Sequence, residues 1–404
     1  HRSVHASGSN DFRVALIGSG NRGTGATADC LRVAPNIKLV TVADAFEERA
    51  RLSCKLLKQR FGEQFAVPED QVFVGLDAYQ KALSCDVDVA ILTAPPGFRP
   101  LHYRAAVEAG THVFMEKPLC VDAGSYRKMM DINKLADEKN RKVGVGLFRR
   151  HNSAYQEQMR QVHDGKIGKI QFLRCYCNMA SWGAFPKRPG ETEMEYQVRN
   201  WRVFDWLGGG RLVEAHCHEL DVMDWAMQDH PRECNGMGGR TILSSEPRFG
   251  EDYDHHFHEY TYADGTKMYS QSRTLSGLWS PISEHVHGDK GVLDLDGKIM
   301  KINEMGKRER TSPYHKEWED LIDAIWSDKP YNEGWFGTTS SFSGVLGREA
   351  SYCGQVVSWD ELSTKGPDLF PRDEFTWETR PPVLPDEQGS YAHAVALPGI
   401  YRPY

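Results

Sequence analysis

The sequence, 404 residues long, lacks the features that mark two broad classes of protein. No apolar run approaches the ~18 residues of a membrane-spanning helix, so we predict no membrane partner. The formal net charge is −7, so the basic excess expected of a nucleic-acid-binding protein is missing and we predict no nucleic-acid partner. The composition that remains is typical of a soluble globular protein, and the length allows two or three domains.

The nine cysteines lack the spacing of a disulfide framework or a zinc ribbon, because their number is odd and no pair of CxxC clusters occurs. Such cysteine usage favours folding in the cytoplasm. Residues 1–10 are small and polar, and we interpret them as an N-terminal linker left after processing. Export of the folded chain to the periplasm after signal removal would satisfy both observations, so the localisation stays open between these two.

A glycine-rich turn follows the first apolar segment of the chain. Residues 12–17 predict a strand, residues 18–23 have the sequence GSGNRG, and a helical pattern begins directly afterwards. In this setting a GxGxxG turn lets the backbone approach a pyrophosphate, and the helix N-terminus offers N–H groups to it. We therefore expect a dinucleotide to contact Gly18, Gly20, Asn21, Arg22 and Gly23.

An acidic residue follows the second predicted strand. That strand, at 39–43, ends at Asp44, which lies 21 residues after Gly23. An acid at this spacing accepts hydrogen bonds from the ribose hydroxyls of a dinucleotide and disfavours a 2′-phosphate. The pattern predicts NAD as the cofactor rather than NADP. The alternative is a surface Asp beside an unrelated glycine turn.

Strand and helix patterns alternate through the first part of the chain. Apolar strands are predicted at 87–92, 112–115 and 142–147, which indicates a parallel sheet covered by helices on both faces. Ligands of such sheets bind at the carboxyl ends of the strands. Those ends carry further candidates for cofactor binding, which are Thr93, Pro95, Glu116 and Lys117.

The segment at 90–118, AILTAPPGFRPLHYRAAVEAGTHVFMEKP, resembles the Gfo/Idh/MocA family of oxidoreductases. The matching features are His102, Ala109-Gly110, His112-Val113 and Glu116-Lys117-Pro118, and the resemblance covers about residues 11–360. It implies an α/β protein with an N-terminal Rossmann domain and a C-terminal α/β domain built on a large, open, mostly antiparallel sheet. The open face is commonly an oligomer interface in this family, so we expect a homo-oligomer, either dimer or tetramer. The resemblance also adds His102 to the cofactor-binding residues.

The expected domain organisation has four parts. The N-terminal linker at 1–10 is followed by the NAD-binding Rossmann domain at 11–148. The substrate-binding and oligomerisation domain spans 149–365. Residues 366–404 are rich in proline and show little periodicity, so we expect a C-terminal arm that wraps the core or a neighbouring subunit.

An insertion at 178–206 is rich in Trp, Tyr, Arg and Gly and shows no clean period. Its length indicates a function, although a purely structural loop would have the same composition. Aromatic faces beside Arg and Asn suit a sugar, because ring faces stack while amides and guanidinium groups bind hydroxyls. The candidates for substrate binding are Tyr196, Arg199, Asn200 and Trp201 from the insertion, with Arg150 and Asp221 outside it.

A helix predicted from residue 211 onward carries an acid and a histidine on one face. Glu214 and His218 are four residues apart, and a carboxylate beside an imidazole suits a general base. The pattern resembles an inositol-dehydrogenase motif in which an acid lies four residues before a His. It departs from that motif in having Glu where Asp is usual and in the additional His216. A buried, satisfied helix pair is the alternative interpretation.

Several histidines invite a metal hypothesis, among them His216, His218 and the cluster at 255–258. On a helix, His216 and His218 diverge by about 200°, which places them poorly for one ion. The chemistry implied by the family resemblance needs no metal, and we predict none.

These features together predict an NAD-dependent oxidoreductase that takes a hydride from a secondary hydroxyl of a sugar, cyclitol or glycoside. His218 is the expected base. Lys117 would hydrogen-bond the reacting oxygen and relay its proton, with a pKa lowered by burial near the cationic nicotinamide. Glu214 would orient His218 or bind a neighbouring hydroxyl.

Two other functions fit the same residues. An NAD-dependent glycosidase would oxidise a ring hydroxyl, eliminate the glycosidic bond, add water and reduce the ketone again with the retained cofactor. A non-catalytic NAD-binding protein is the second alternative, although the presence of Glu116, Lys117, Glu214 and His218 weighs against it.

Overall fold

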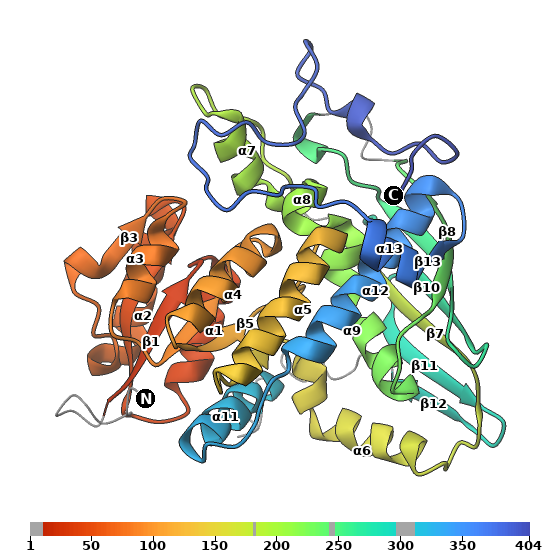
Figure 1. The fold of residues 1–404 in the computed structure, drawn as a ribbon, viewed down its shortest axis with the longest axis horizontal. Coiled ribbons are helices and arrows are strands. Elements are labelled where there is room, and N and C mark those ends of the chain that lie inside the picture. The colour runs from red at the N-terminus through yellow and green to blue at the C-terminus, as the bar shows by residue number, and fades with distance from the viewer. Residues whose placement is uncertain (1–10, 181–182, 242–246, 296–311) are drawn as a thin grey trace.

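Two β-sheets organise the fold, and helices lie between them (Figure 1). The computed structural model describes residues 11–180, 183–241, 247–295 and 312–404. The predicted linker at 1–10 lies outside the described residues. No described helix combines the length and the apolar character needed to cross a membrane.

The first sheet has six parallel strands in the order β3-β2-β1-β4-β5-β6, as in a Rossmann fold. Its central strands are continuously apolar because helices cover both faces, and Val14, Leu16 and Ile91 are fully buried. The strands are β1 (Phe12–Ile17), β2 (Ile37–Asp44), β3 (Val72–Val74), β4 (Val89–Leu92), β5 (His112–Met115) and β6 (Val143–Val145). The helices between them are α1 (Asn21–Leu31), α2 (Glu47–Phe61), α3 (Ala78–Ser84), α4 (Arg99–Glu108) and α5 (Ala123–Glu138). The predicted Rossmann fold is confirmed.

One helix from the second half of the chain also packs on this sheet. α11 (Pro313–Trp326) places the ring of Trp318 on that of Phe114 in β5, with 4.2 Å between the ring centroids. Leu321 and Ile322 continue this buried apolar stripe. The segment predicted as the second domain therefore contributes a helix to the first core.

The second sheet has seven strands in the order β12-β11-β7-β10-β9-β8-β13, and all neighbouring pairs except β7 and β10 are antiparallel. Alternate residues of β10 are buried, because one face of the sheet packs against helices α9 and α12. The strands are β7 (Ile170–Met179), β8 (Glu233–Gly239), β9 (His255–Thr261), β10 (Lys267–Thr274), β11 (Ile282–Gly288), β12 (Val292–Leu295) and β13 (Val357–Ser358). The helices of this half are α6 (Ser153–His163), α9 (Gly210–Met227), α12 (Gly334–Cys353) and α13 (Trp359–Lys365). The predicted open, mostly antiparallel sheet is confirmed.

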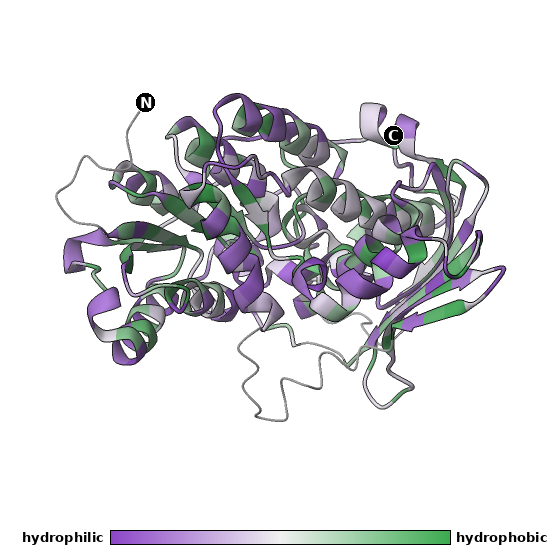
Figure 2. Ribbon diagram, turned by 90° about the horizontal axis from the view of Figure 1, so that it is seen from below, coloured by the Kyte–Doolittle hydropathy of each residue, from purple (hydrophilic) through white to green (hydrophobic). Residues whose placement is uncertain are grey.

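The other face of the second sheet forms one edge of the molecule (Figure 2). Met237 of β8 and Phe257 of β9 are cross-strand partners on this face, and both are exposed. Phe172 of β7 is exposed on the same face. These side chains would be available to a second copy of the chain, and the homo-oligomer stays a prediction.

The insertion and the C-terminal arm form a third apolar cluster with loops of the first sheet. The insertion contains α7 (Glu193–Arg199) and α8 (Asp205–Gly208). Phe98, in the loop after β4, stands edge-on to Trp206 of α8 and to Phe375 of the arm. The arm runs across the insertion in Figure 1, so within one chain it covers the region beside the ends of the first sheet.

Candidate active site

A cavity of about 830 Å³ lies at the carboxyl ends of β1, β2 and β4. Such ends are where an open α/β sheet binds its ligand. The structure brings together at this cavity nearly all residues predicted to bind the cofactor. Its lining includes Gly18, Gly20, Asn21, Arg22, Gly23, Asp44, Thr93, Pro95 and His102.

The glycines of the turn fit a dinucleotide for different steric reasons. Gly18 has φ +93°, and a Cβ there would lie 2.3 Å from the backbone nitrogen of Ala94. A Cβ on Gly23 would lie 2.0 Å from the carbonyl oxygen of Gly18. A Cβ on Gly20 would meet nothing within 4 Å, so its backbone borders open space that a ligand can approach closely. The turn therefore has the shape that a pyrophosphate requires.

Asp44 is held rigidly at the end of β2. Its Oδ2 accepts hydrogen bonds from the backbone nitrogen and the hydroxyl of Ser19, at 2.6 and 3.0 Å. Its Oδ1 accepts one from the backbone nitrogen of Phe46 at 2.9 Å. Burial raises the pKa of Asp44, while these hydrogen bonds oppose the shift. The carboxylate is thus fixed beside the glycine turn, where the ribose-binding acid of a Rossmann fold lies.

His102 is buried beneath the cavity. Its ring lies 4.4 Å from the ring of Tyr79, and burial together with Arg99 lowers its pKa to about 3. The imidazole is therefore neutral at physiological pH. Arg99 donates to the carbonyl oxygens of Leu92 and Ala94, which fixes the end of β4 that shapes the cavity.

Lys117 joins the first sheet to the second half of the chain. Its Nζ donates a hydrogen bond to the backbone carbonyl oxygen of Glu214 in α9 and lies 3.9 Å from Oε1 of the same residue. Burial alone would lower the pKa of Lys117, but the Glu214 carboxylate and other negative groups outweigh burial and raise it. In the free protein the raised pKa favours the charged form of Lys117, and the lowering expected beside the cationic nicotinamide stays a prediction.

Glu214 and His218 share a helical face, but within the described residues no hydrogen bond joins them. The carboxylate of Glu214 lies between Lys117 and Arg202, whose Nε is 3.4 Å from Oε1. The Nδ1 of His218 has no hydrogen-bond partner in the described structure, and its ring stands edge-on to Phe148 at 5.1 Å. The predicted orientation of His218 by Glu214 is therefore wrong, because the helix directs the carboxylate toward the two cations instead.

The surroundings of His218 hold its ring neutral. Burial lowers its pKa well below the ordinary value, and the positive charges of Lys117 and Arg149 act in the same direction. A neutral imidazole can accept a proton, which a general base requires. His218 and Lys117 thus supply a base and a cation at the junction of the two domains.

Arg150 and Asp221 form a buried pair rather than a substrate site. The guanidinium of Arg150 donates to both carboxylate oxygens of Asp221 at 2.8–3.0 Å, and Ser340 donates to the same carboxylate at 2.7 Å. Asp221 is 1% exposed. The prediction that these two residues bind substrate is wrong, because their polar atoms tie α9 to α12 and to the chain leaving the first sheet.

Three of the four candidates in the insertion fold that segment onto itself. Arg199 pairs with Glu191 at 2.5 Å, and the amide of Asn200 bonds the backbone of Phe185. Tyr196 is buried in the third apolar cluster. The substrate-binding prediction is wrong for Tyr196 and Asn200, since their side chains are used in packing, and Arg199 reaches the cavity lining only as part of its ion pair.

Trp201 and its neighbour Arg202 line the same cavity as the glycine turn. The Arg202 guanidinium lies 4.5 Å from the centre of the Trp201 ring and also approaches Glu214. Trp201 was predicted from the sequence as a substrate contact, whereas Arg202 was not. Arg202 could have been selected from the sequence because it directly follows Trp201 in a segment rich in Arg and aromatic residues.

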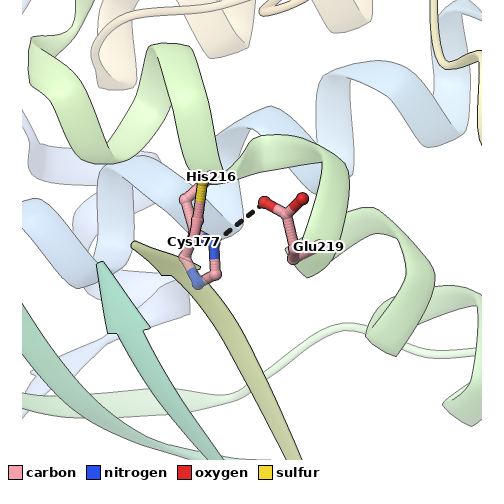
Figure 3. A group of neighbouring side chains, drawn as sticks. All are labelled: Cys177, His216 and Glu219. Atoms are coloured by element: carbon pink, nitrogen blue, oxygen red, sulfur yellow. Dashed lines mark hydrogen bonds and ion pairs between the residues drawn. The ribbon is translucent and has the colours of Figure 1, made fainter. Parts of the chain in front are cut away.

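Away from the cavity, the buried residues Cys177, His216 and Glu219 form a cluster with the spacing of a metal site (Figure 3). His216 Nδ1 lies 3.0 Å from Glu219, and its Nε2 lies 2.7 Å from the hydroxyl of Ser270. Burial would raise the pKa of Glu219, but Arg149, 2.7 Å away, and His216 lower it to about 2. Because Arg149 already neutralises the carboxylate and both ring nitrogens have partners, we interpret the cluster as a hydrogen-bonded network that anchors α9 on the second sheet.

The fold and the cavity define a class: an NAD-binding oxidoreductase with a Rossmann domain and a second, sheet-based domain. The chain belongs to the Gfo/Idh/MocA family. The model of the oxidoreductase family with an NAD-binding Rossmann fold matches residues 12–147, and that of the GFO/IDH/MocA C-terminal domain matches residues 155–294. The resemblance stated from the sequence is confirmed.

Curated relatives match part of the chain. This chain is 27% identical over 221 residues to inositol 2-dehydrogenase of Klebsiella pneumoniae (strain 342), and the match covers 55% of this chain and 56% of that protein. It is 26% identical over 242 residues to 2,7-anhydro-N-acetylneuraminate hydratase of Mediterraneibacter gnavus, covering 58% and 59%. The chain thus spans little more than half the length of these relatives.

A solved structure of similar fold covers more of the chain. The crystal structure of scyllo-inositol dehydrogenase from Lactobacillus casei, with bound NAD(H) and scyllo-inositol, superimposes with a TM-score of 0.65. The match covers 86% of this chain and 99% of that one at 16% identity, so it shows a shared fold.

Replacing Asp44 tests the preference for NAD. We expect Asp44→Ala to weaken NAD binding on the order of tenfold, because the acceptor for the ribose hydroxyls and the partner of Ser19 are both lost. NADP binding should weaken less or improve, since a negative charge is removed. Titration calorimetry with both dinucleotides measures the two affinities, and Asp70→Ala, at an exposed acid of the same domain, is the control. An unchanged preference for NAD in Asp44→Ala would contradict the assignment.

Proposed function

We propose that this protein is an NAD-dependent oxidoreductase that removes a hydride from a secondary hydroxyl of a sugar, cyclitol or glycoside. The observation that carries the proposal is the contact of Lys117 with Glu214, which brings the end of the cofactor sheet to the helix that bears a neutral His218. The named activities of relatives, inositol 2-dehydrogenase among them, support a polyhydroxylated substrate.

When bound in the cavity, NAD supplies the hydride acceptor. His218 accepts the hydroxyl proton, which its neutral ring permits. Lys117 donates a hydrogen bond to the reacting oxygen and stabilises the negative charge that develops there as the proton leaves. Because Lys117 is already charged in the free protein, it acts as a donor and not as the base. The hydride leaves the carbon with its electron pair, and the alcohol becomes a ketone.

Trp201, Arg202 and Glu214 are the proposed substrate contacts. Trp201 and Arg202 line the cavity, and the Arg202–Glu214 pair lies next to Lys117. An aromatic ring offers a stacking face to a sugar, and a guanidinium beside a carboxylate can donate to one hydroxyl while the carboxylate accepts from the next. In this arrangement Glu214 would bind a substrate hydroxyl, which is the second of the two roles predicted for it.

The outer face of the second sheet is the proposed contact between copies of the chain. Phe172, Met237 and Phe257 lie on one face of the second sheet and are exposed. Apolar side chains arranged in this way favour association with a like surface.

The alternative function, glycoside cleavage with a retained cofactor, is favoured by one feature of the cavity. The insertion supplies its outer wall through Phe185, Val198 and Trp201, and the third apolar cluster locks that wall against the C-terminal arm. A dinucleotide behind this wall would leave slowly, as a recycled cofactor must. The Mediterraneibacter relative is named as a hydratase and not as a dehydrogenase.

Replacing Lys117 tests the proposed function. We expect Lys117→Ala to lower kcat/KM by a factor of about 10²–10³, because the charge that stabilises the reacting oxygen is lost. NAD affinity should change less than about threefold, since Lys117 does not line the cavity. Steady-state kinetics on a panel of polyols, with calorimetric titration of NAD, measure both quantities. Lys134→Ala, at a lysine whose side chain is 74% exposed, is the control. Wild-type turnover in Lys117→Ala would remove Lys117 from the mechanism.

The two catalytic functions differ in the fate of the hydride. Under the proposed oxidation, NADH absorbance rises in proportion to the ketone formed when a glycoside panel is incubated with NAD. Cleavage of a glycoside with no added NAD and no net NADH would replace oxidation by the alternative. Chromatography of the sugars alongside absorbance distinguishes these results.

A further inference from the structure

A carboxyl group without a hydrogen-bond partner lies behind the cofactor cavity. Glu317 of α11 is 1% exposed, and neither of its carboxyl oxygens has a hydrogen-bond partner within the described residues. Its Oε1 is 3.7 Å from NH2 of Arg22, and that nitrogen also has no hydrogen-bond partner there. Leaving a buried carboxyl unpaired is costly, so its presence calls for a physical explanation.

Arg22 connects this carboxyl to the cavity. It belongs to the glycine turn and lines the cavity, and its guanidinium lies 4.8 Å from the centre of the Tyr314 ring. Its Nε donates to Glu116 at 2.6 Å. Glu116 directly precedes Lys117, so one guanidinium links the glycine turn, the lysine motif and α11. This places Glu116, predicted to bind the cofactor, behind the cavity wall as the partner of Arg22.

The chain makes room for this arrangement. A Cβ on Gly146, just after β6, would lie 2.5 Å from Oε2 of Glu116. Any larger residue at 146 would displace the Glu116 carboxylate from Arg22. The glycine at 146 therefore leaves the space that the Glu116 carboxylate needs to reach Arg22.

The groups that face Glu317 come from its own helix and from the segments packed around it. They are Arg22 on α1, Glu116 after β5, His151 in the short helix at Phe148–His151, Glu333 before α12, and the phenols Tyr314 and Tyr331. Burial raises the pKa of Glu317 well above its usual value, Glu116 adds to the effect, and Arg22 and His151 oppose it. Burial would lower the pKa of His151, but its hydrogen bond to Asp320 and its ion pair with Glu333 raise it to about 10.

This balance decides the charge around Arg22. With Glu317 neutral, the guanidinium has two carboxylates beside it, Glu116 at 2.6 Å and Asp29 at 4.0 Å. If Glu317 ionises, a third carboxylate adjoins the same guanidinium, and the added negative charge lies next to the turn that approaches a dianionic pyrophosphate.

We propose that Glu317 is a positioning residue for the cofactor: its buried carboxyl packs against Arg22 behind the cavity wall and so helps to hold the guanidinium at the cavity for the bound dinucleotide. The inference rests on the proposed use of NAD, but it does not depend on the hydride chemistry. NAD binding should therefore weaken as pH rises and Glu317 loses its proton.

The test is the pH dependence of NAD affinity in the wild type and in Glu317→Gln, which keeps the shape and cannot ionise. As the pH rises and Glu317 loses its proton, the wild-type Kd should rise roughly 3- to 10-fold, as expected for one added unit charge near the phosphates. Glu317→Gln should hold the low-pH affinity throughout the range. Calorimetry of NAD binding gives these values without any turnover.

Two controls make the outcome decisive. Glu319→Gln changes a more exposed acid on the same helix and should keep the wild-type pH dependence. Thermal unfolding of each variant checks that it is folded. The proposal is overturned if Glu317→Gln retains the wild-type pH dependence, which would assign it to another group such as His151. It is also overturned if Glu317→Gln binds NAD more than about tenfold more weakly at the lowest pH, because the ionised form would then be the one required.

Because binding is measured and not turnover, failure here is distinct from failure of the proposed function. A flat wild-type profile with normal activity would remove Glu317 from cofactor positioning and leave hydride transfer untouched. Normal pH-dependent binding with no activity on any polyol would do the reverse.

Discussion

The hydrogen bond from Lys117 to the backbone carbonyl of Glu214 is the contact on which the rest of the site depends. It joins the end of the cofactor sheet to α9, the helix that carries His218, so that Lys117 contacts both domains. Because the acceptor is a backbone carbonyl, the contact leaves the Glu214 carboxylate available to Arg202 and to substrate hydroxyls. The geometry thus separates the anchoring of Lys117 from the recognition of substrate.

Electrostatics then assign the roles of the two central side chains. Both are largely withdrawn from solvent, and this desolvation alone would push each toward its neutral form. Nearby carboxylates reverse this effect at Lys117, whereas the cations Lys117 and Arg149 reinforce it at His218. The same cluster of charges therefore keeps one group positive and the other neutral. Lys117 can therefore act as a hydrogen-bond donor and His218 as a base, which is the pair of groups that hydride transfer from an alcohol requires.

Local patterns in the sequence were sufficient for the cofactor half of the site. The glycine turn, Asp44 and the strand ends follow from short-range spacing, because parallel strands bring their carboxyl ends to one edge. The sheet topology of both domains followed from the family resemblance. The substrate half was less predictable. Helical periodicity placed Glu214 and His218 on one face, yet the Glu214 carboxylate faces Lys117 and Arg202 and the His218 ring packs on Phe148, and none of these three lies on that helix. Likewise, nothing near Tyr196 or Asn200 indicated that the arm would bury the insertion.

The most direct test of the central claim is the pH dependence of kcat/KM for a polyol substrate. A base must be deprotonated to act, and a lowered pKa moves the acid limb of the profile toward lower pH. The account predicts that activity stays on its plateau below about pH 6.5, the ordinary pKa of histidine, and falls only in more acid solution. An acid limb at or above that value, with the protein still folded, would contradict the assignment of His218 as a base held neutral by its surroundings.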